Sequence, residues 1–343
     1  MTTDILLGKT LQELKNIATE LGLPAFTAKQ LCEWLYTKKV TDINEMTNIS
    51  LKNRTILSQQ FTVGRSRPIQ EQCAADGTKK YLFEATQGLI ETVFIPEEHR
   101  GTLCVSSQVG CKMNCLFCMT GKQGFSGNLS SAEILNQILS VPESDQLTNI
   151  VFMGMGEPFD NTLPLLKALE IIGAEYGLAW SPRRITVSSI GILPGLKTFL
   201  DKSECHLAIS LHSPFEKERE MLLPIEKAYP LTDILEILKT YDFKHQRRVS
   251  FEYILFEGLN DSMRHARELV RMLSRIPCRV NLIRYHAIPG VELKGCTTAK
   301  MIEFRDYLTA NNIITTIRKT RGEDILAACG MLSTEKTNKE KNN

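Results

Sequence analysis

Apolar residues near the start of the chain recur every three or four positions, which is the period of an amphipathic helix. Two such series are present, at Leu11, Leu14, Ile17, Ala18 and Leu21, and at Ala28, Leu31 and Leu35. We therefore expect residues 9–62 to form short helices within a small N-terminal accessory domain, residues 1–75. That segment contains no catalytic constellation, so binding a partner and a purely packing role both remain open for it.

From about residue 78 the pattern changes to that of β-strands. KKYLFEAT and LIETVFI are rich in β-branched and aromatic residues, and Gly88 marks a turn between them. Further along, strand-like segments are expected at 148–154, 184–189, 206–211, 249–256, 278–284 and 313–318. Segments with helical period are expected at about 131–140, 161–177, 231–242, 261–275 and 297–310.

Repeated strand-then-helix units predict an α/β fold in which helices wrap a parallel sheet. The strand-like segments that follow residue 118 are too few for a closed eight-fold barrel, so we expect an open, partial (β/α)6-type barrel over residues 76–332. Chemistry in such a barrel belongs at the carboxyl ends of the strands, where the loops gather. Residues 333–343, STEKTNKEKNN, have no apolar anchor and are expected to be a disordered tail.

Composition is that of an ordinary globular protein, with 43% hydrophobic and 23% charged residues among 343. The first residues do not resemble a signal peptide, and no run approaches the roughly 18 apolar residues of a membrane-spanning helix. We therefore expect a cytoplasmic protein without a membrane partner.

The net charge of +2 neither requires nor excludes a nucleic-acid partner. Basic residues do gather in separate segments, at Arg183 and Arg184, at Lys244, His245, Arg247 and Arg248, and at Arg318, Lys319 and Arg321. They could converge on one surface or cover unrelated solvated faces.

Ten cysteines in a cytoplasmic chain favour metal binding or catalysis over structural disulfides, because that compartment keeps thiols reduced. Isolated cysteines usually behave as small core hydrophobes. We expect that of Cys32, Cys73, Cys205, Cys278 and Cys296.

The strongest chemical signal is Cys-x-x-x-Cys-x-x-Cys at Cys111, Cys115 and Cys118, after the strand-like segment TLCVSS. Three thiolates can bind three irons of a [4Fe–4S] cluster and leave the fourth iron open. That iron can chelate the amino and carboxylate groups of S-adenosylmethionine (SAM), whose one-electron cleavage gives an adenosyl radical. A structural zinc site is the alternative, but it usually needs a second Cys or Cys/His pair close in sequence.

Polar residues and glycines follow several predicted strands. The run Met153 to Pro158, MGMGEP, contains Gly156 and Glu157, and a carboxylate there can accept from the SAM ammonium group. Ser188 and Ser189 end the next strand, and Ser210 to His212 end the one after. Together these residues outline a pocket on one rim of the sheet.

The run LCVSSQVGCKMNCLFCMTGKQGF, with MGMGEP, SLHSP and DILAACG, resembles the RlmN/Cfr family of radical SAM RNA methyltransferases over nearly the whole chain. This resemblance implies methylation of an adenosine in 23S rRNA, at the peptidyl-transferase centre, and of the tRNA adenosine just 3′ of the anticodon. It assigns the N-terminal piece to RNA binding and the cluster to Cys111, Cys115 and Cys118. It places SAM contacts at Gly156, Glu157, Ser188, Ser210, Leu211, His212 and His286, where the family commonly has Asn in the last position.

The resemblance also assigns catalytic roles to Cys329, Cys104 and Glu91. A first SAM methylates Cys329, and a second SAM supplies the radical that activates the resulting S-methyl group. Cys104 then resolves the RNA adduct through a transient disulfide, and Glu91 accepts a proton. An electron donor such as flavodoxin is implied.

Two other functions stay open at this point. Methylation at C8 is the nearest alternative, although Val109 and GKQGF resemble the members that methylate C2. A cluster-bearing RNA-binding protein that has lost catalysis is the other, and retention of Glu91, Cys104, Cys329 and the GEP motif argues against it.

Overall fold

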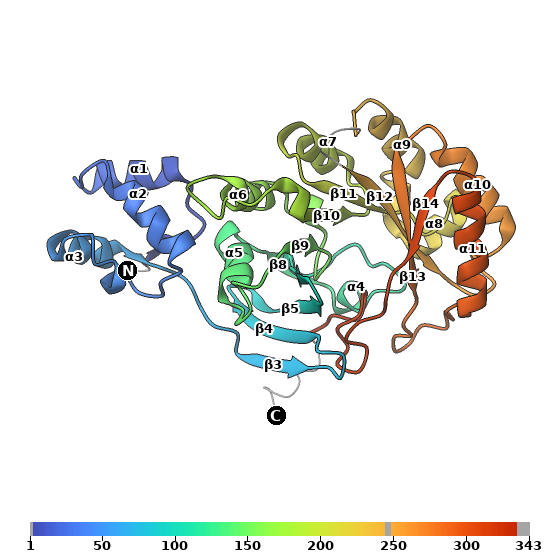
Figure 1. The fold of residues 1–343 in the computed structure, drawn as a ribbon, viewed down its shortest axis with the longest axis horizontal. Coiled ribbons are helices and arrows are strands. Elements are labelled where there is room, and N and C mark those ends of the chain that lie inside the picture. Colours follow the sequence, from blue (N-terminus) through green and yellow to red (C-terminus); the bar gives the residue numbers. More distant parts are fainter. Residues whose placement is uncertain (1–2, 244–247, 335–343) are drawn as a thin grey trace.

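A computed structural model describes residues 3–243 and 248–334, and Figure 1 shows a small N-terminal domain beside a larger α/β domain. The N-terminal domain contains three α-helices, a π-helical turn, a 3-10 turn and a short parallel strand pair. These are β1 (Asp4–Ile5), α1 (Leu11–Glu20), α2 (Thr27–Cys32), η1 (Glu33–Thr37), η2 (Ile43–Glu45), α3 (Leu51–Gln60) and β2 (Phe61–Thr62). The helices expected within residues 9–62 are present.

The apolar series of the first helix faces the core of this domain. Leu14, Ile17 and Ala18 are buried, and Thr10 and Glu13 close the start of α1 with a capping box. The domain is joined to the larger one by polar contacts, including an ion pair between Lys167 and Glu13 at 2.5 Å. It therefore has a defined place beside α5 (Ser131–Ser140) and α6 (Thr162–Gly173) of the larger domain (Figure 1).

The larger domain is built on one sheet in the order β14-β13-β12-β11-β10-β9-β6-β5-β4-β3. Neighbours from β6 through β9 to β14 pair in parallel, and β3 to β6 pair antiparallel. The strands are β3 (Gln70–Cys73), β4 (Lys79–Ala85), β5 (Gly88–Glu97), β6 (Arg100–Cys104), β9 (Asn149–Phe152), β10 (Ile185–Ser189), β11 (His206–Ser210), β12 (Val249–Leu255), β13 (Cys278–Arg284) and β14 (Ile314–Ile317). The sheet is open, as predicted, and β6 adds a parallel strand ahead of the six expected ones. β3 comes from the segment assigned to the N-terminal domain, yet it pairs with β4.

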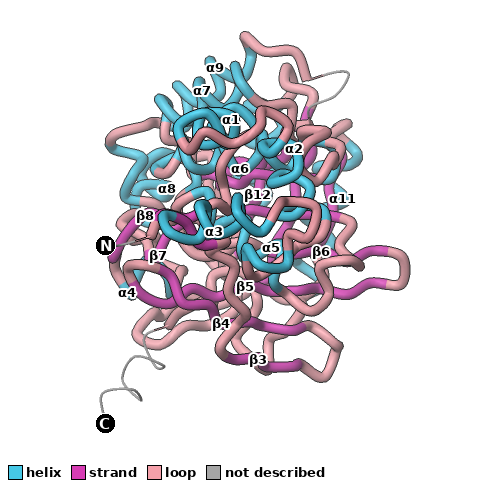
Figure 2. The backbone as a smooth tube through the Cα atoms, turned by 90° about the vertical axis from the view of Figure 1, so that its left-hand side faces the viewer, coloured by secondary structure: helices cyan, strands magenta, loops and turns pink. Residues whose placement is uncertain are grey.

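Helices cover the parallel part of the sheet (Figures 1 and 2). They are α4 (Met119–Gln123), α5 (Ser131–Ser140), α6 (Thr162–Gly173), α7 (Leu193–Lys202), α8 (Glu216–Leu222), α9 (Leu231–Lys239), α10 (Met263–Leu273) and α11 (Thr298–Ala310). Short 3-10 turns lie at η3 (Pro158–Asp160), η4 (Pro182–Arg184) and η5 (Pro224–Lys227), and a hairpin pairs β7 (Gln108–Gly110) with β8 (Phe125–Asn128).

Three helices of the larger domain, α4, α7 and α8, were not predicted, and α4 has only five residues. Helix α7 begins with Pro194 and Gly195, which look like helix breakers, but a proline is tolerated in the first turn because its missing N–H has no partner there. Helix α8 is short and its sequence, EKEREML, is largely charged. The remaining helices fall where the 3.6-residue period placed them, with ends that differ by a few residues.

The segment 320–334, which we call the C-terminal strap, crosses between α4 and the β3–β4 turn. At one end, the Gly322 N–H donates to Asp76 (3.1 Å) and the Ala75 N–H donates to Asp324 (2.9 Å). At the other, the Met119 N–H donates to the Gly330 carbonyl (2.7 Å). The strap is therefore anchored on both sides.

The predicted disordered tail begins too early. Thr334 is fully buried, and it exchanges hydrogen bonds with Gln123 through its N–H (2.9 Å) and its hydroxyl (2.7 Å). These contacts satisfy polar groups that composition alone assigned to solvent. Residues 335–343 lie outside the described residues. Among the described residues, no helix is both long and apolar enough to cross a membrane.

The glycines after β9 are required by the chain itself. A Cβ at Gly154 would lie 2.7 Å from the Ser106 hydroxyl and 2.8 Å from the Val105 carbonyl. At Gly156, where φ is +96°, it would lie 2.8 Å from the Gln108 backbone nitrogen. The loop after β6 thus packs directly on the turn after β9, which sets the spacing of the two loops.

Replacing Gly156 with Ala should therefore destabilise the protein by more than its backbone conformation alone explains. Gly258→Ala is the matched control, because Gly258 also has a positive φ, +72°, but no atom within 4 Å of its would-be Cβ. We expect about 1 kcal/mol for the control and at least twice that for Gly156→Ala. Thermal unfolding followed by circular dichroism measures both, and equal losses would contradict the packing argument.

Candidate active site

The three clustered cysteines line one cavity at the carboxyl ends of the parallel strands. Cys111, Cys115 and Cys118 all face it, and it encloses about 910 Å³ including its mouth. Cys111 and Cys115 are buried and Cys118 is half-buried. A volume of this size suits a cofactor with a bound small molecule.

Burial raises the pKa of all three thiols, that of Cys111 to about 12. Without a positive partner these groups would stay protonated at neutral pH. The irons of a bound cluster would supply that charge, since a coordinating thiol is deprotonated by its metal. The donor set and the cavity therefore fit a cluster held by three thiolates.

Glu157 also lines this cavity. Its side chain is 4% exposed and accepts from the Ser189 hydroxyl (2.6 Å), the Ile190 N–H (3.0 Å) and the Phe159 N–H (3.0 Å). Burial raises its pKa to about 7 despite these hydrogen bonds. Oε2 accepts only from Ile190 among these donors, so it retains a lone pair for a cation in the cavity.

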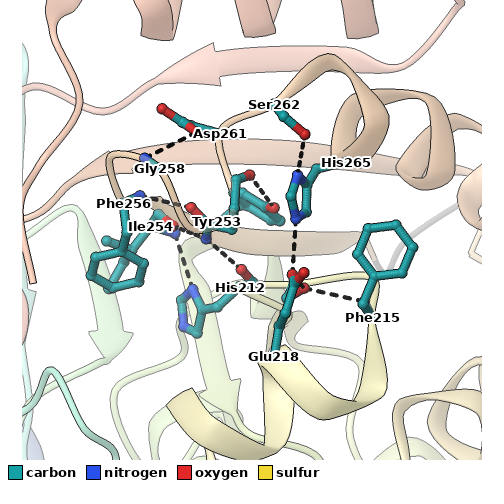
Figure 3. Close-up of polar contacts among 12 residues, drawn as sticks. His212, Phe215, Glu218, Tyr253, Ile254, Phe256, Gly258, Asp261, Ser262 and His265 are labelled. Atoms are coloured by element: carbon teal, nitrogen blue, oxygen red, sulfur yellow. Dashed lines mark hydrogen bonds and ion pairs between the residues drawn. The ribbon is translucent and has the colours of Figure 1, made fainter.

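Ser188, Ser210 and His212 complete the wall, as the sequence predicted. His212 has φ of 55°, and its Nδ1 accepts from the Ile254 N–H at 3.0 Å (Figure 3). Burial lowers the pKa of this imidazole to about 3, so it is neutral. Because Nδ1 accepts, the proton must lie on Nε2, and the ring is a hydrogen-bond donor at that atom.

Leu211 differs from its neighbours. Its side chain is fully buried and is absent from the cavity wall. Its N–H donates to the Glu252 carbonyl (2.9 Å) and its carbonyl accepts from Arg219 (3.2 Å). Leu211 therefore stabilises the loop that follows β11, and its side chain does not line the pocket.

A second cavity adjoins the first, and Cys329 stands between them. Met153, Ile283, Arg318, Cys329 and Leu332 line both cavities, while Cys104 lines the second. The structure thus brings together the two cysteines that lie far apart in sequence. It does so through the parallel sheet, which holds Cys104 at the end of β6, and through the C-terminal strap, which carries Cys329.

Neither cysteine is in a disulfide, and all ten cysteines of the chain, each within the described residues, are free. Burial raises the pKa of Cys104 to about 12, and the nearby Arg318 guanidinium opposes that rise. Arg318 itself is held by Glu252 at 3.4 Å. The positive charge of Arg318 therefore lies close to Cys104, in the cavity that Cys104 and Cys329 both line.

Glu91 and His286 are not brought into the cluster cavity. Glu91 faces a third cavity, where its carboxylate contacts Lys80 (2.9 Å) and accepts from the Ser333 N–H (2.9 Å). Burial raises the pKa of Glu91. His286 lines the Cys104 cavity, and its Nδ1 lies 3.1 Å from Glu323.

Within the part of the chain that the structure describes, the basic segments do not converge on one surface. Arg318, Lys319 and Arg321 line the cavity of Cys104 and Cys329 at the carboxyl ends of the strands. Arg183 and Arg248 lie at the opposite strand ends, where burial, together with the charges of Arg248, Arg183 and Arg279, lowers the pKa of His206 to about 4. Lys244, His245 and Arg247 lie outside the described residues.

Sequence reasoning missed three polar residues that hold the site. They are Gln108, which accepts from the Glu157 N–H, Asn260, which donates to the His212 carbonyl, and Arg219, which donates to three strand-end carbonyls. All three are fully buried. Arg219 was not recognised because it lies within a charged run that is typical of a solvated face.

The isolated cysteines mostly lie where the sequence predicted. Cys32, Cys205 and Cys296 are buried and Cys278 is half-buried, but Cys73 is exposed, so the core interpretation was wrong for Cys73.

Comparison with known proteins identifies the family. Residues 105–270 match the Radical SAM superfamily, and residues 5–63 match the Ribosomal RNA large subunit methyltransferase N-terminal domain. A probable dual-specificity RNA methyltransferase RlmN of Parabacteroides distasonis is 61% identical over 96% of this chain and 97% of its own length. The dual-specificity RNA methyltransferase RlmN of Desulfotalea psychrophila is 42% identical over 96% and 94%.

A solved structure agrees with this assignment. The crystal structure of a radical SAM methyltransferase from Sphaerobacter thermophilus has a TM-score of 0.91 and 35% identity, and covers 97% of this chain and all of its own. Identity at this level over the full length shows a shared family as well as a shared fold. The chain therefore belongs to the RlmN family of the radical SAM superfamily.

Proposed function

We propose that this protein transfers a methyl group to C2 of adenosine in 23S rRNA and in tRNA, through an S-methylated Cys329. The observation that carries the proposal is the position of Cys329, which lines both the cavity of the cluster cysteines and the cavity of Cys104. The Cys329 thiol can therefore contact SAM bound in the first cavity and the Cys104 thiol in the second. Membership of the family supports the substrate assignment.

Cys111, Cys115 and Cys118 would hold the [4Fe–4S] cluster, and Glu157, Gly156, Ser188, Ser210 and His212 would hold SAM at its open iron. When bound, the cluster and SAM together supply a 5′-deoxyadenosyl radical. Around them, Glu157 offers a carboxylate oxygen to the SAM ammonium group, and neutral His212 offers its Nε2–H. Gly154 and Gly156 line the same cavity, so their backbone would lie close to a ligand bound there.

The C2 carbon of adenine has no lone pair, so it cannot attack the SAM methyl group as an ordinary nucleophile. Cys329 can, because a thiolate is a competent nucleophile, and the displacement releases S-adenosylhomocysteine. The S-methyl group would then give up a hydrogen atom to the adenosyl radical, which becomes 5′-deoxyadenosine, and the methylene carbon would bond to C2 of the adenine ring. Arg318, Lys319 and Arg321 at this cavity are suited to contact RNA phosphates.

Release requires Cys104. After the ring carbon loses its proton and the adduct gives up one electron, which the oxidised cluster would take up, the Cys104 thiolate attacks the Cys329 sulfur and breaks its bond to the methylene carbon. That carbon takes up a proton and becomes the methyl group. The products are methylated RNA and a Cys104–Cys329 disulfide, which an external reductant must reopen. Glu91 is the proposed proton acceptor, and its hydrogen bond from Ser333 has to open when RNA enters, since the two cavities are separate.

The N-terminal domain is proposed to bind RNA, and a flavodoxin-type protein is proposed to donate the electron. A ribosomal RNA substrate and unpaired thiols both suit the cytoplasm. The target base must leave its stack so that its C2 atom can reach Cys329, which is exposed and lines both cavities.

Protein purified without oxygen should be brown and carry about four irons per chain. Replacing Cys111, Cys115 or Cys118 with Ala should abolish both the colour and SAM cleavage, whereas Cys32→Ala, a change at a buried cysteine of the N-terminal domain, should keep both. Iron analysis and chromatography of 5′-deoxyadenosine make the measurement. Normal iron content in all three variants would show that Cys111, Cys115 and Cys118 are not the cluster ligands.

Replacing Cys329 and replacing Cys104 should block the reaction at different steps. Cys329→Ala should lose the S-methyl group and all RNA methylation, while Cys104→Ala should form the RNA adduct and fail to release it. A protein–RNA band on a denaturing gel reports the adduct, and Cys73→Ala, at an exposed cysteine, is the control. Normal turnover of Cys104→Ala without an adduct would show that Cys104 does not resolve it.

A further inference from the structure

Helix α8 lies between the strand ends that form the SAM pocket and the loop that carries the cluster cysteines. A helix of seven residues is not stable alone, so its contacts must set its position. On one side, Glu218 accepts from the Ser213 hydroxyl (2.7 Å) and lies 2.8 Å from His265 Nε2. Figure 3 shows this contact continuing from His265 to Ser262, which fastens α8 to the start of α10.

On its other side, α8 is fastened to the sheet by Arg219, which is fully buried. Nε donates to the Leu211 carbonyl (3.2 Å), and one terminal nitrogen donates to the carbonyls of Ile190 and Ser210 (both 3.0 Å). The other terminal nitrogen is paired with the buried carboxylate of Glu226. The three carbonyls follow or end β10 and β11, which are the strands that carry Ser188, Ser210 and His212.

The carboxyl end of the same helix reaches the cluster loop. The Leu116 N–H, between Cys115 and Cys118, donates to the Leu222 carbonyl at 2.9 Å. About one turn of helix therefore separates Arg219, which hydrogen-bonds to the SAM-binding strand ends, from Leu222, which hydrogen-bonds to the cluster loop. A shift of α8 would move these two halves of the site relative to each other.

We propose that Arg219 is a positioning residue that fixes the SAM-binding ends of β10 and β11 relative to the cluster loop. The inference rests on the proposed function, because it needs SAM to span the two. A planar guanidinium can serve three carbonyls and a carboxylate at once, whereas a lysine ammonium cannot match that fork. Reaction geometry of this kind tolerates errors of only about half an ångström.

The test uses the cluster-loaded enzyme without reductant, so that SAM binds but is not cleaved. Arg219→Met combined with Glu226→Leu removes the pair without stranding a buried charge, so the fold should persist. Equilibrium dialysis with radiolabelled SAM should show affinity about 10- to 100-fold weaker, the usual effect of losing a partner that orients a ligand. Iron content should be unchanged, and the KM for SAM should rise by a similar factor with a smaller change in kcat.

Arg219→Lys keeps a cation beside Glu226 and should show a smaller loss of SAM affinity. This variant replaces the double variant in the test if the double variant does not fold. Met301→Ala is the control for a general loss of stability. It leaves a cavity in the core at α11, far along the chain from the SAM-binding residues, and should not change the affinity for SAM. Wild-type SAM affinity in the Arg219 variants, or an equal loss in Met301→Ala, would overturn the positioning role. Failure of the wild-type enzyme to bind or cleave SAM would instead overturn the proposed function.

Discussion

The position of Cys329 depends on hydrogen bonds that hold the C-terminal strap against two separate parts of the sheet domain. Asp76 and Asp324 fix the strap near the β3–β4 turn, and the Gly330 carbonyl fixes it to the start of α4, just after Cys118. These bonds place a residue near the end of the chain beside the cluster loop. Without them, the thiol proposed to receive the methyl group would have no fixed relation to the cavity of the cluster cysteines.

The same strap separates Glu91 from the cysteines. Ser333 donates its N–H to the Glu91 carboxylate on one side, while Cys329 faces the other cavities. A base proposed for a late step is therefore capped in this state by the segment that carries the proposed methyl carrier. Exchange of that hydrogen bond for contact with RNA would couple entry of the substrate to exposure of the base.

Much of the barrel and its chemical residues could be predicted from sequence, because they follow local rules. Strand and helix periods located β9 to β14 and most helices, and the spacing of Cys111, Cys115 and Cys118 indicated a cluster. What sequence could not predict depends on contacts between distant segments. Arg219 looks solvated within EKEREML, and its burial follows from strand-end carbonyls that a linear pattern does not bring together. Likewise, Thr334 looks like part of a solvated tail until Gln123 is placed beside it.

The central claim is that the methyl carbon reaches RNA through Cys329 rather than directly from SAM. Over many turnovers, SAM with a trideuterated methyl group should give 2-methyladenosine whose new methyl carries two deuteriums and one hydrogen, because one deuterium leaves Cys329 in the radical step. Digestion of rRNA or tRNA to nucleosides, followed by chromatography and mass spectrometry, measures this. An intact trideuterated methyl group on the product would contradict the account.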